Sequence, residues 1–113
     1  VFPHVVFIHH RLLPHFSAQL LTITDSTIAN NTAQAEAGAI NSVFTSPVLL
    51  IHCTITGNSV TNAGNGTGGV RADPVGSVTV RNSIITGNTD ANIPGIPDIA
   101  PGFISQGTNI IGT

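Results

Sequence analysis

The side chains that could take part in acid–base chemistry are few and widely spaced in this sequence. Its acidic residues are Asp25, Glu36, Asp73, Asp90 and Asp98. Glycoside hydrolysis needs two carboxyl groups across the scissile bond, and lyase chemistry needs clustered carboxylates for calcium with a basic residue to take a proton. No two of these acids occupy equivalent positions of the repeat that organises the chain. We therefore expect no active site within these residues.

Three of the acids have structural interpretations. Asp73 lies close to Arg71, and the pair is interpreted as surface charge. Asp90 and Asp98 flank the loop ANIPGIP and are interpreted as turn residues, because Asp favours turns beside Pro and Gly.

Nucleophilic and metal-binding groups are equally sparse. Cys53 is the only cysteine, and its neighbour His52 would point to the opposite face of a strand. We interpret Cys53 as a small buried hydrophobe, with a reactive thiol as the weaker alternative. Zinc or copper could bind histidines near the N-terminus, but no cysteine or acid joins them, so solvated histidines are the preferred interpretation. These are His4, His9, His10 and His15.

Two further motifs invite functional interpretations that their context does not favour. The glycine-rich stretch GNGTGG at 64–69 lacks the lysine and helix of a phosphate loop, so we expect a flexible insertion. Thr22 and Thr24 suggest an ice-binding threonine array. The repeat places them beside Leu49 and Ile51, which breaks the array. Arg81 is expected on the outer face of a strand.

Composition restricts the class of protein. The chain has 113 residues, which is room for one domain, and 41% are hydrophobic but only 7% charged. Three arginines, no lysine and a net charge of −2 provide no basic surface for nucleic acid. No apolar run reaches the roughly 20 residues that span a bilayer. We expect no nucleic-acid partner and no membrane span.

One strand-like phrase occurs three times, and this repeat must position the side chains named above. It reads LTITDSTIANN at 21–31, VLLIHCTITGN at 48–58 and VTVRNSIITGN at 78–88. Aligned on Asn31, Asn58 and Asn88, the phrases place apolar residues in shared columns. The columns are Leu21, Val48 and Val78; Ile23, Leu50 and Val80; and Ile28, Ile55 and Ile85. A later feature, GAI at 38–40, matches GGV at 68–70.

The spacing within each phrase indicates a corner. Apolar positions alternate before and after Asp25, but with reversed parity, so a bend at Asp25, His52 and Asn82 would turn both strands inward. Ser26, Cys53 and Ser83 would then fill a narrow inward corner. Such a unit buries its apolar row only by stacking on copies of itself, which predicts a parallel β-solenoid. Stacked Asn residues could hydrogen-bond along the column and adopt the left-handed backbone of a corner.

These motifs resemble bacterial right-handed parallel β-helix surface proteins. The phrase ITxSTIxxN followed by GGI is similar to that of choice-of-anchor Q domain proteins, and GGAI and NxA elements are similar to polymorphic outer-membrane-protein repeats. The late segment is also similar, through Asp98, Ile99, Phe103, Ser105, Gly107 and 109–112. The resemblance covers about residues 20–113, and the pectate-lyase-like superfamily shares this fold. It implies an extracellular or cell-surface location.

The expected organisation is all-β. We predict a right-handed parallel β-helix of three to four coils over 20–113, with coils starting near 21, 48 and 78 and a terminal segment at 98–113. Residues 1–19 are predicted to be an N-terminal cap or degenerate first coil, with a strand at 5–8 and apolar residues that plug the interior. The plug residues are Leu12, Leu13 and Phe16. A disordered tail is the alternative.

We expect a non-catalytic structural segment, serving as a stalk, an adhesin-like spacer or a self-assembling solenoid. The expected partners are further β-helix coils or identical copies stacked end to end, and surface glycans are a further candidate. The alternative is a fragment of a polysaccharide-active or carbohydrate-binding β-helix protein. No catalytic, cofactor or metal site is predicted.

Overall fold

Parallel β-strands make up all of the regular secondary structure that the structure describes. The computed structural model describes residues 8–11, 20–43, 47–61, 66–72, 78–91, 98–100 and 102–112. Within these ranges there is no helix, so none is long and apolar enough to cross a bilayer. Every strand pair is parallel. The strands are rich in Val, Ile and Thr, whose branched side chains suit a pleated surface.

The strands form four sheets, here named A to D. Sheet A contains β1 (Ile8–Arg11), β5 (Ile40–Val43) and β9 (Val70–Ala72) in that order. Sheet B runs from β2 (Leu21–Thr24) through β6 (Val48–Ile51) and β10 (Val78–Arg81) to β13 (Ile104–Gln106). Sheet C runs from β3 (Thr27–Ala29) through β7 (Thr54–Thr56) and β11 (Ile84–Ile85) to β14 (Ile110–Ile111). Sheet D contains β4 (Thr32–Ala33), β8 (Ser59–Val60) and β12 (Thr89–Asp90).

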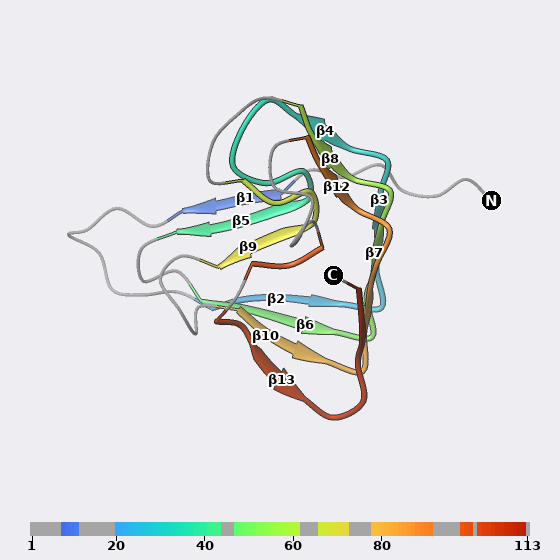
Figure 1. Cartoon of the computed structure of the whole chain (residues 1–113). Coiled ribbons are helices and arrows are strands. Elements are labelled where there is room, and N and C mark those ends of the chain that lie inside the picture. The colour runs from blue at the N-terminus through green and yellow to red at the C-terminus, as the bar shows by residue number, and fades with distance from the viewer. Residues whose placement is uncertain are drawn as a thin grey trace.

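Consecutive strands of the chain belong to different sheets, and each sheet collects strands one repeat apart, with β13 and β14 adding a fourth strand to sheets B and C alone. Sheets A and B face each other, and sheet C runs along one side of the molecule (Figure 1). The chain thus passes from β2 to β3, β4 and β5 before it returns to sheet B at β6. This arrangement is all-β with parallel strands in stacked sheets, as a parallel β-solenoid requires.

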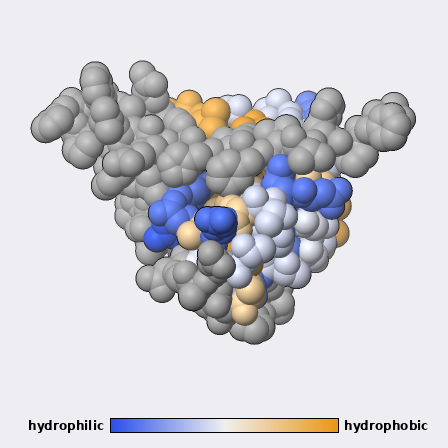
Figure 2. Space-filling model, turned by 90° about the horizontal axis from the view of Figure 1, so that it is seen from above, coloured by the Kyte–Doolittle hydropathy of each residue, from blue (hydrophilic) through white to orange (hydrophobic). Residues whose placement is uncertain are grey.

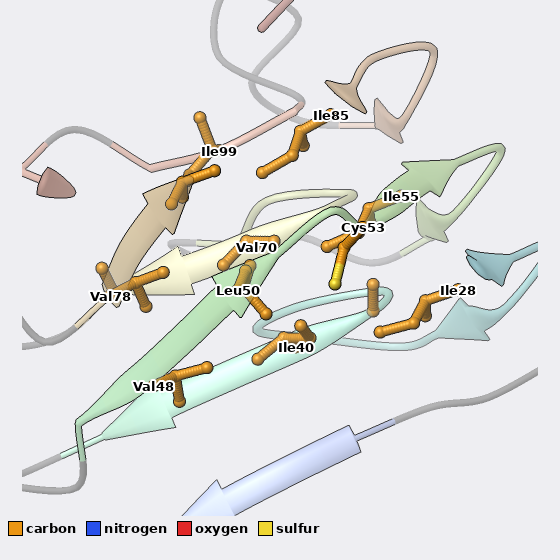
Figure 3. Close-up of a cluster of buried hydrophobic side chains, with 13 residues drawn as sticks. Ile28, Ile40, Val48, Leu50, Cys53, Ile55, Val70, Val78, Ile85 and Ile99 are labelled. Carbon is orange, nitrogen blue, oxygen red and sulfur yellow. The ribbon is translucent and has the colours of Figure 1, made fainter. Parts of the chain in front are cut away.

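The register confirms the predicted apolar columns. Leu21, Val48 and Val78 are paired across sheet B, as are Ile23, Leu50 and Val80. In sheet C, Ile28, Ile55 and Ile85 are paired in the same way. Most of these side chains form one buried cluster, which residues of sheet A join (Figure 3), while Leu21 and Ile23 are partly buried and pack against it. Each fully buried aliphatic side chain contributes roughly 1.5–3 kcal/mol of transfer free energy.

Two corners per repeat depend on left-handed backbone. Asp25, His52 and Asn82 have φ of 50°, 53° and 48°, which confirms the predicted bend between sheets B and C. The second corner precedes sheet D and has positive φ at Asn30, Gly57 and Gly87. Here the prediction was wrong by one residue, because the aligned asparagines were expected to adopt the left-handed backbone themselves. Asn and Gly carry the smallest penalty for this conformation.

The N-terminal strand extends sheet A. β1 pairs in parallel with β5, with Ile8 opposite Ile40 and Arg11 opposite Val43. Of the predicted strand at 5–8, only Ile8 is described, and it is the first residue of β1; 5–7 lie outside the described residues. The predicted plug of Leu12, Leu13 and Phe16 also lies outside them.

Candidate functional site

A column of buried asparagines, the asparagine ladder of Asn31, Asn58 and Asn88, joins successive repeats. Asn31 donates from its main-chain N and from Nδ2 to Asn58 Oδ1, at 3.0 and 2.9 Å. Asn58 donates from the same two atoms to Asn88 Oδ1, again at 3.0 and 2.9 Å. A residue with positive φ precedes each ladder asparagine, and this turn of the main chain directs the asparagine side chain into the stack. The predicted column of amide hydrogen bonds is thus confirmed.

Asp98 supplies the last acceptor of this ladder. Asn88 donates from its main-chain N and from Nδ2 to Asp98 Oδ1, both at 2.7 Å. Asp98 lies at a bend, as the predicted turn residue would, but its side chain is buried and accepts hydrogen bonds, a role that was not predicted. The alignment of the repeats missed this role, because Asp98 follows Asn88 after ten residues, in a different part of the repeat.

A second polar column lies at the corner between sheets B and C. Ser83 Oγ accepts a hydrogen bond from the main-chain N of Cys53 at 3.0 Å, and Asn109 Oδ1 accepts one from the main-chain N of Ser83 at 2.9 Å. Cys53 and Ser83 are buried and Ser26 is partly buried, as predicted for the inward corner. This role of Asn109 was not predicted, although Asn109 directly precedes Ile110 in the sequence just as Ser83 directly precedes Ile84, and the two isoleucines are register partners.

Cys53 behaves as a small buried group. Its Sγ lies 3.3 Å from the carbonyl oxygen of Ile23 and 3.4 Å from that of Ile51. Burial raises the pKa of the Cys53 thiol above its ordinary value of 9.0, because a low-dielectric surrounding disfavours the thiolate. His52 is exposed at the corner between β6 and β7 and its Nδ1 faces Asp25, so the structure does not bring His52 and Cys53 together as base and nucleophile.

The left-handed corner carries an exposed Asp–His pair. His52 Nδ1 lies 3.2 Å from Asp25 Oδ1, and the two side chains are 58% and 77% exposed. Asn82 follows in the same column and its Oδ1 accepts a hydrogen bond from Thr108 N at 3.0 Å. At this exposure the pair contributes little stability, because solvent screens the charges. One carboxylate beside a histidine and an amide lacks the second acid that glycoside hydrolysis needs.

A polar cluster of Glu36, Asn41 and Arg71 lies on sheet A and its neighbouring turn. Asn41 Nδ2 donates to Glu36 Oε2, and Arg71 Nη1 is 4.0 Å from Glu36 Oε1. Asn41 and Arg71 are register partners in β5 and β9. Arg71 therefore has an ionic partner that the sequence did not indicate. Its predicted partner Asp73 lies outside the described residues. The cluster holds the turn at Glu36, which has φ of 72°, against the sheet.

Asp90 is a strand residue and not the turn residue that was expected. It is the last residue of β12, pairs with Val60 in β8 and is buried. Ala33 and Val60 occupy the preceding positions of its column. Within the described ranges, the carboxylates of Asp25, Glu36, Asp90 and Asp98 all fall in different columns, in agreement with the prediction.

The histidine site predicted as a weaker alternative is only partly covered by the structure. His9 and His10 lie in β1, whereas His4 and His15 fall outside the described residues. Among the residues that the structure describes, no group of three His, Cys, Asp or Glu side chains could hold a metal ion.

The outer faces of the sheets are mixed in character. Thr22 pairs with Leu49 and Thr24 with Ile51, so the threonine array is broken as predicted. Arg81 is exposed and donates from Nε to Gln106 Oε1 at 2.6 Å. On the described part of the face in Figure 2, hydrophilic and weakly hydropathic residues separate small hydrophobic areas.

The glycines at 66–69 are buried and not part of a flexible insertion. A Cβ at Gly68 would lie 2.3 Å from the carbonyl oxygen of Thr89, and one at Gly69 would lie 2.0 Å from that of Asp98. Thr67, which lies between Gly66 and Gly68 in the sequence, is fully buried and forms an isolated parallel β-bridge with Ala37. The glycines are thus required by close approach between main chains of successive repeats. Residues 64 and 65 lie outside the described residues.

Comparisons with known proteins do not extend this picture. No protein-family model, curated protein or solved structure matches the chain. The resemblance to bacterial β-helix surface proteins, and the location that it implies, therefore stay predictions.

Proposed function

We propose that this chain is a non-catalytic structural segment of a secreted or cell-surface protein, in which stacked coils act as a rigid spacer. The observation that carries the proposal is the continuity of the asparagine ladder and the three apolar columns through successive repeats. The ladder asparagines and the Cys53–Ser83–Asn109 corner use their polar atoms to join one repeat to the next.

Stiffness is a physical consequence of such a stack. Each repeat is tied to the next by parallel main-chain hydrogen bonds in the four sheets, by one buried amide column and by a close-packed interior. A bend would have to lengthen hydrogen bonds in several sheets at once and open gaps in a densely packed core. Repeat stacks of this kind transmit force along their axis through nearest-neighbour interfaces.

The finer description of the fold belongs to the same proposal. We assign the coils a right-handed course, because parallel strands of one sheet are joined by right-handed crossovers in about 98% of cases. The natural partners of such a segment are further coils of the same kind, and the resemblance described above favours an extracellular or cell-surface location.

Polysaccharide assays test the absence of catalysis. We expect no release of reducing ends or unsaturated products from a panel that includes polygalacturonate, and no saturable binding in calorimetry. Cleavage, or binding that Arg71→Ala removes and Gln34→Ala leaves intact, would favour the carbohydrate-active alternative. Gln34 is an exposed residue outside the polar cluster and is a suitable control.

Single-molecule pulling of the chain between two handle domains tests the spacer role. We expect one cooperative unfolding event at a defined force, and a lower force for Asn58→Ala but not for Gln34→Ala. A chain that extends gradually, without a cooperative event, would contradict a load-resistant spacer.

A further inference from the structure

The asparagine ladder has a direction, which follows from how each amide is used. Asn58 Oδ1 accepts two hydrogen bonds from Asn31, while Asn58 Nδ2 and main-chain N donate to Asn88. Each internal member therefore accepts from the preceding repeat and donates to the following one. A repeat added at the C-terminal end gains two hydrogen bonds only if the last member can still donate.

Asp98 has the acceptor of a ladder residue but lacks its donors. Its Oδ1 receives the same pair of hydrogen bonds from Asn88 that Asn88 Oδ1 receives from Asn58. An ionised carboxylate has no hydrogen to donate onward. The main chain of Asp98 belongs to another column, where its carbonyl accepts from the main-chain N of Val70 at 2.9 Å.

Gly112 lies beside the place of the ladder that Asp98 fills. Gly112 follows β14, the fourth strand of sheet C, and its main-chain N donates to the carbonyl of Ile85 at 2.9 Å. A Cβ at Gly112 would lie 2.1 Å from Asp98 Oδ2. The chain can pass beside the carboxylate at this point only because residue 112 has no side chain.

We propose that Asp98 is a stop built into the ladder, which closes the C-terminal end of this stack against head-to-tail addition of a second copy of the chain. An added coil would receive no donor from this column, and its own ladder oxygen would face a carboxylate. The proposal deepens the structural role inferred above and rests on it. It selects a discrete spacer over an open filament among the forms that a structural solenoid can take.

Asp98→Asn tests this stop, because the amide keeps the acceptor for Asn88 and adds a donor toward the next place. The matched control is Asp25→Asn, which makes the same change of charge at an exposed corner. In sedimentation equilibrium from micromolar to millimolar concentration, we expect wild type and Asp25→Asn to remain monomeric. We expect the association constant of Asp98→Asn to rise at least about tenfold, which corresponds to 1.4 kcal/mol.

Two results would overturn the proposal: concentration-dependent end-to-end association of the wild type, or sedimentation of Asp98→Asn that equals that of the wild type. Protection of the Asn88 side-chain amide from hydrogen exchange verifies that the variant keeps its ladder.

A double-mutant cycle provides a measurement that does not depend on association. Gly112→Ala should lower the free energy of unfolding of the wild type strongly and that of the Asp98→Ala variant much less. Equal losses in the two backgrounds would refute the view that the Asp98 carboxylate lies against residue 112. Polysaccharide cleavage would overturn the proposed function alone, so the two failures are distinguishable.

Discussion

Replacing Asn58 with alanine removes the central member of the asparagine ladder. Asn58 is fully buried, and its Nδ2 donates to the carbonyl of Ile28, to that of Thr56 and to Asn88 Oδ1. Its Oδ1 accepts from the main-chain N and from Nδ2 of Asn31. The substitution deprives these two donors of their acceptor, and each buried donor that loses its partner costs about 1–3 kcal/mol.

The expected loss is therefore about 2–6 kcal/mol, a large part of the roughly 5–15 kcal/mol that stabilises a typical domain. Urea unfolding followed by far-ultraviolet circular dichroism measures it, because the chain has no Trp or Tyr for fluorescence. With a slope of about 2 kcal/mol/M, the midpoint should fall by at least about 1 M.

Gln34→Ala removes an exposed amide and serves as the control for this loss. Its free energy of unfolding should change by less than about 0.5 kcal/mol. Equal stability of Asn58→Ala and Gln34→Ala would refute the view that the ladder holds the coils together.

Further substitutions test other parts of the stack. Ile55→Ala should cost about 2–5 kcal/mol in urea unfolding because Ile55 is fully buried, whereas Ile84→Ala, at a side chain that is 38% exposed, should cost clearly less. Cys53→Ser should cost little, since Ser83 occupies the same column, and loss of folding would contradict that equivalence. Because the pKa of Cys53 is raised, its thiol stays protonated to a higher pH in the folded state than in the unfolded state. The free energy of unfolding of the wild type should therefore fall as pH rises through 9.0, and Cys53→Ser should abolish this part of the pH dependence. Gly87→Val should lower the thermal midpoint more than Gly87→Asn, because φ is 75° at Gly87 and a β-branched residue resists this conformation more than Asn does.

The apolar columns and the inward corner were predictable because the repeat is periodic. Strands of one sheet in a parallel stack are separated by one repeat, so aligning the phrases on Asn58 and Asn88 also aligns their register. The pairing of Ile55 with Ile85 follows from this alignment, and the bend at His52 follows from the reversed parity of apolar positions within a single phrase. The sequence also predicted that Cys53 and His52 point in opposite directions, and the structure has Cys53 buried and His52 exposed, although both lie at the corner between β6 and β7 and not within a strand.

Only the tertiary structure showed where the polar residues outside the three aligned phrases lie and which partners they bind. Asp98 enters the ladder from a segment that the alignment cannot place, and a Cβ at Gly112 would lie 2.1 Å from its Oδ2. Arg71 meets Glu36 across a turn, and Asp90 occupies a buried strand position that Val60 holds in the preceding repeat. Periodicity specifies contacts between equivalent positions, whereas contacts between non-equivalent positions depend on how the loops return the chain to the stack.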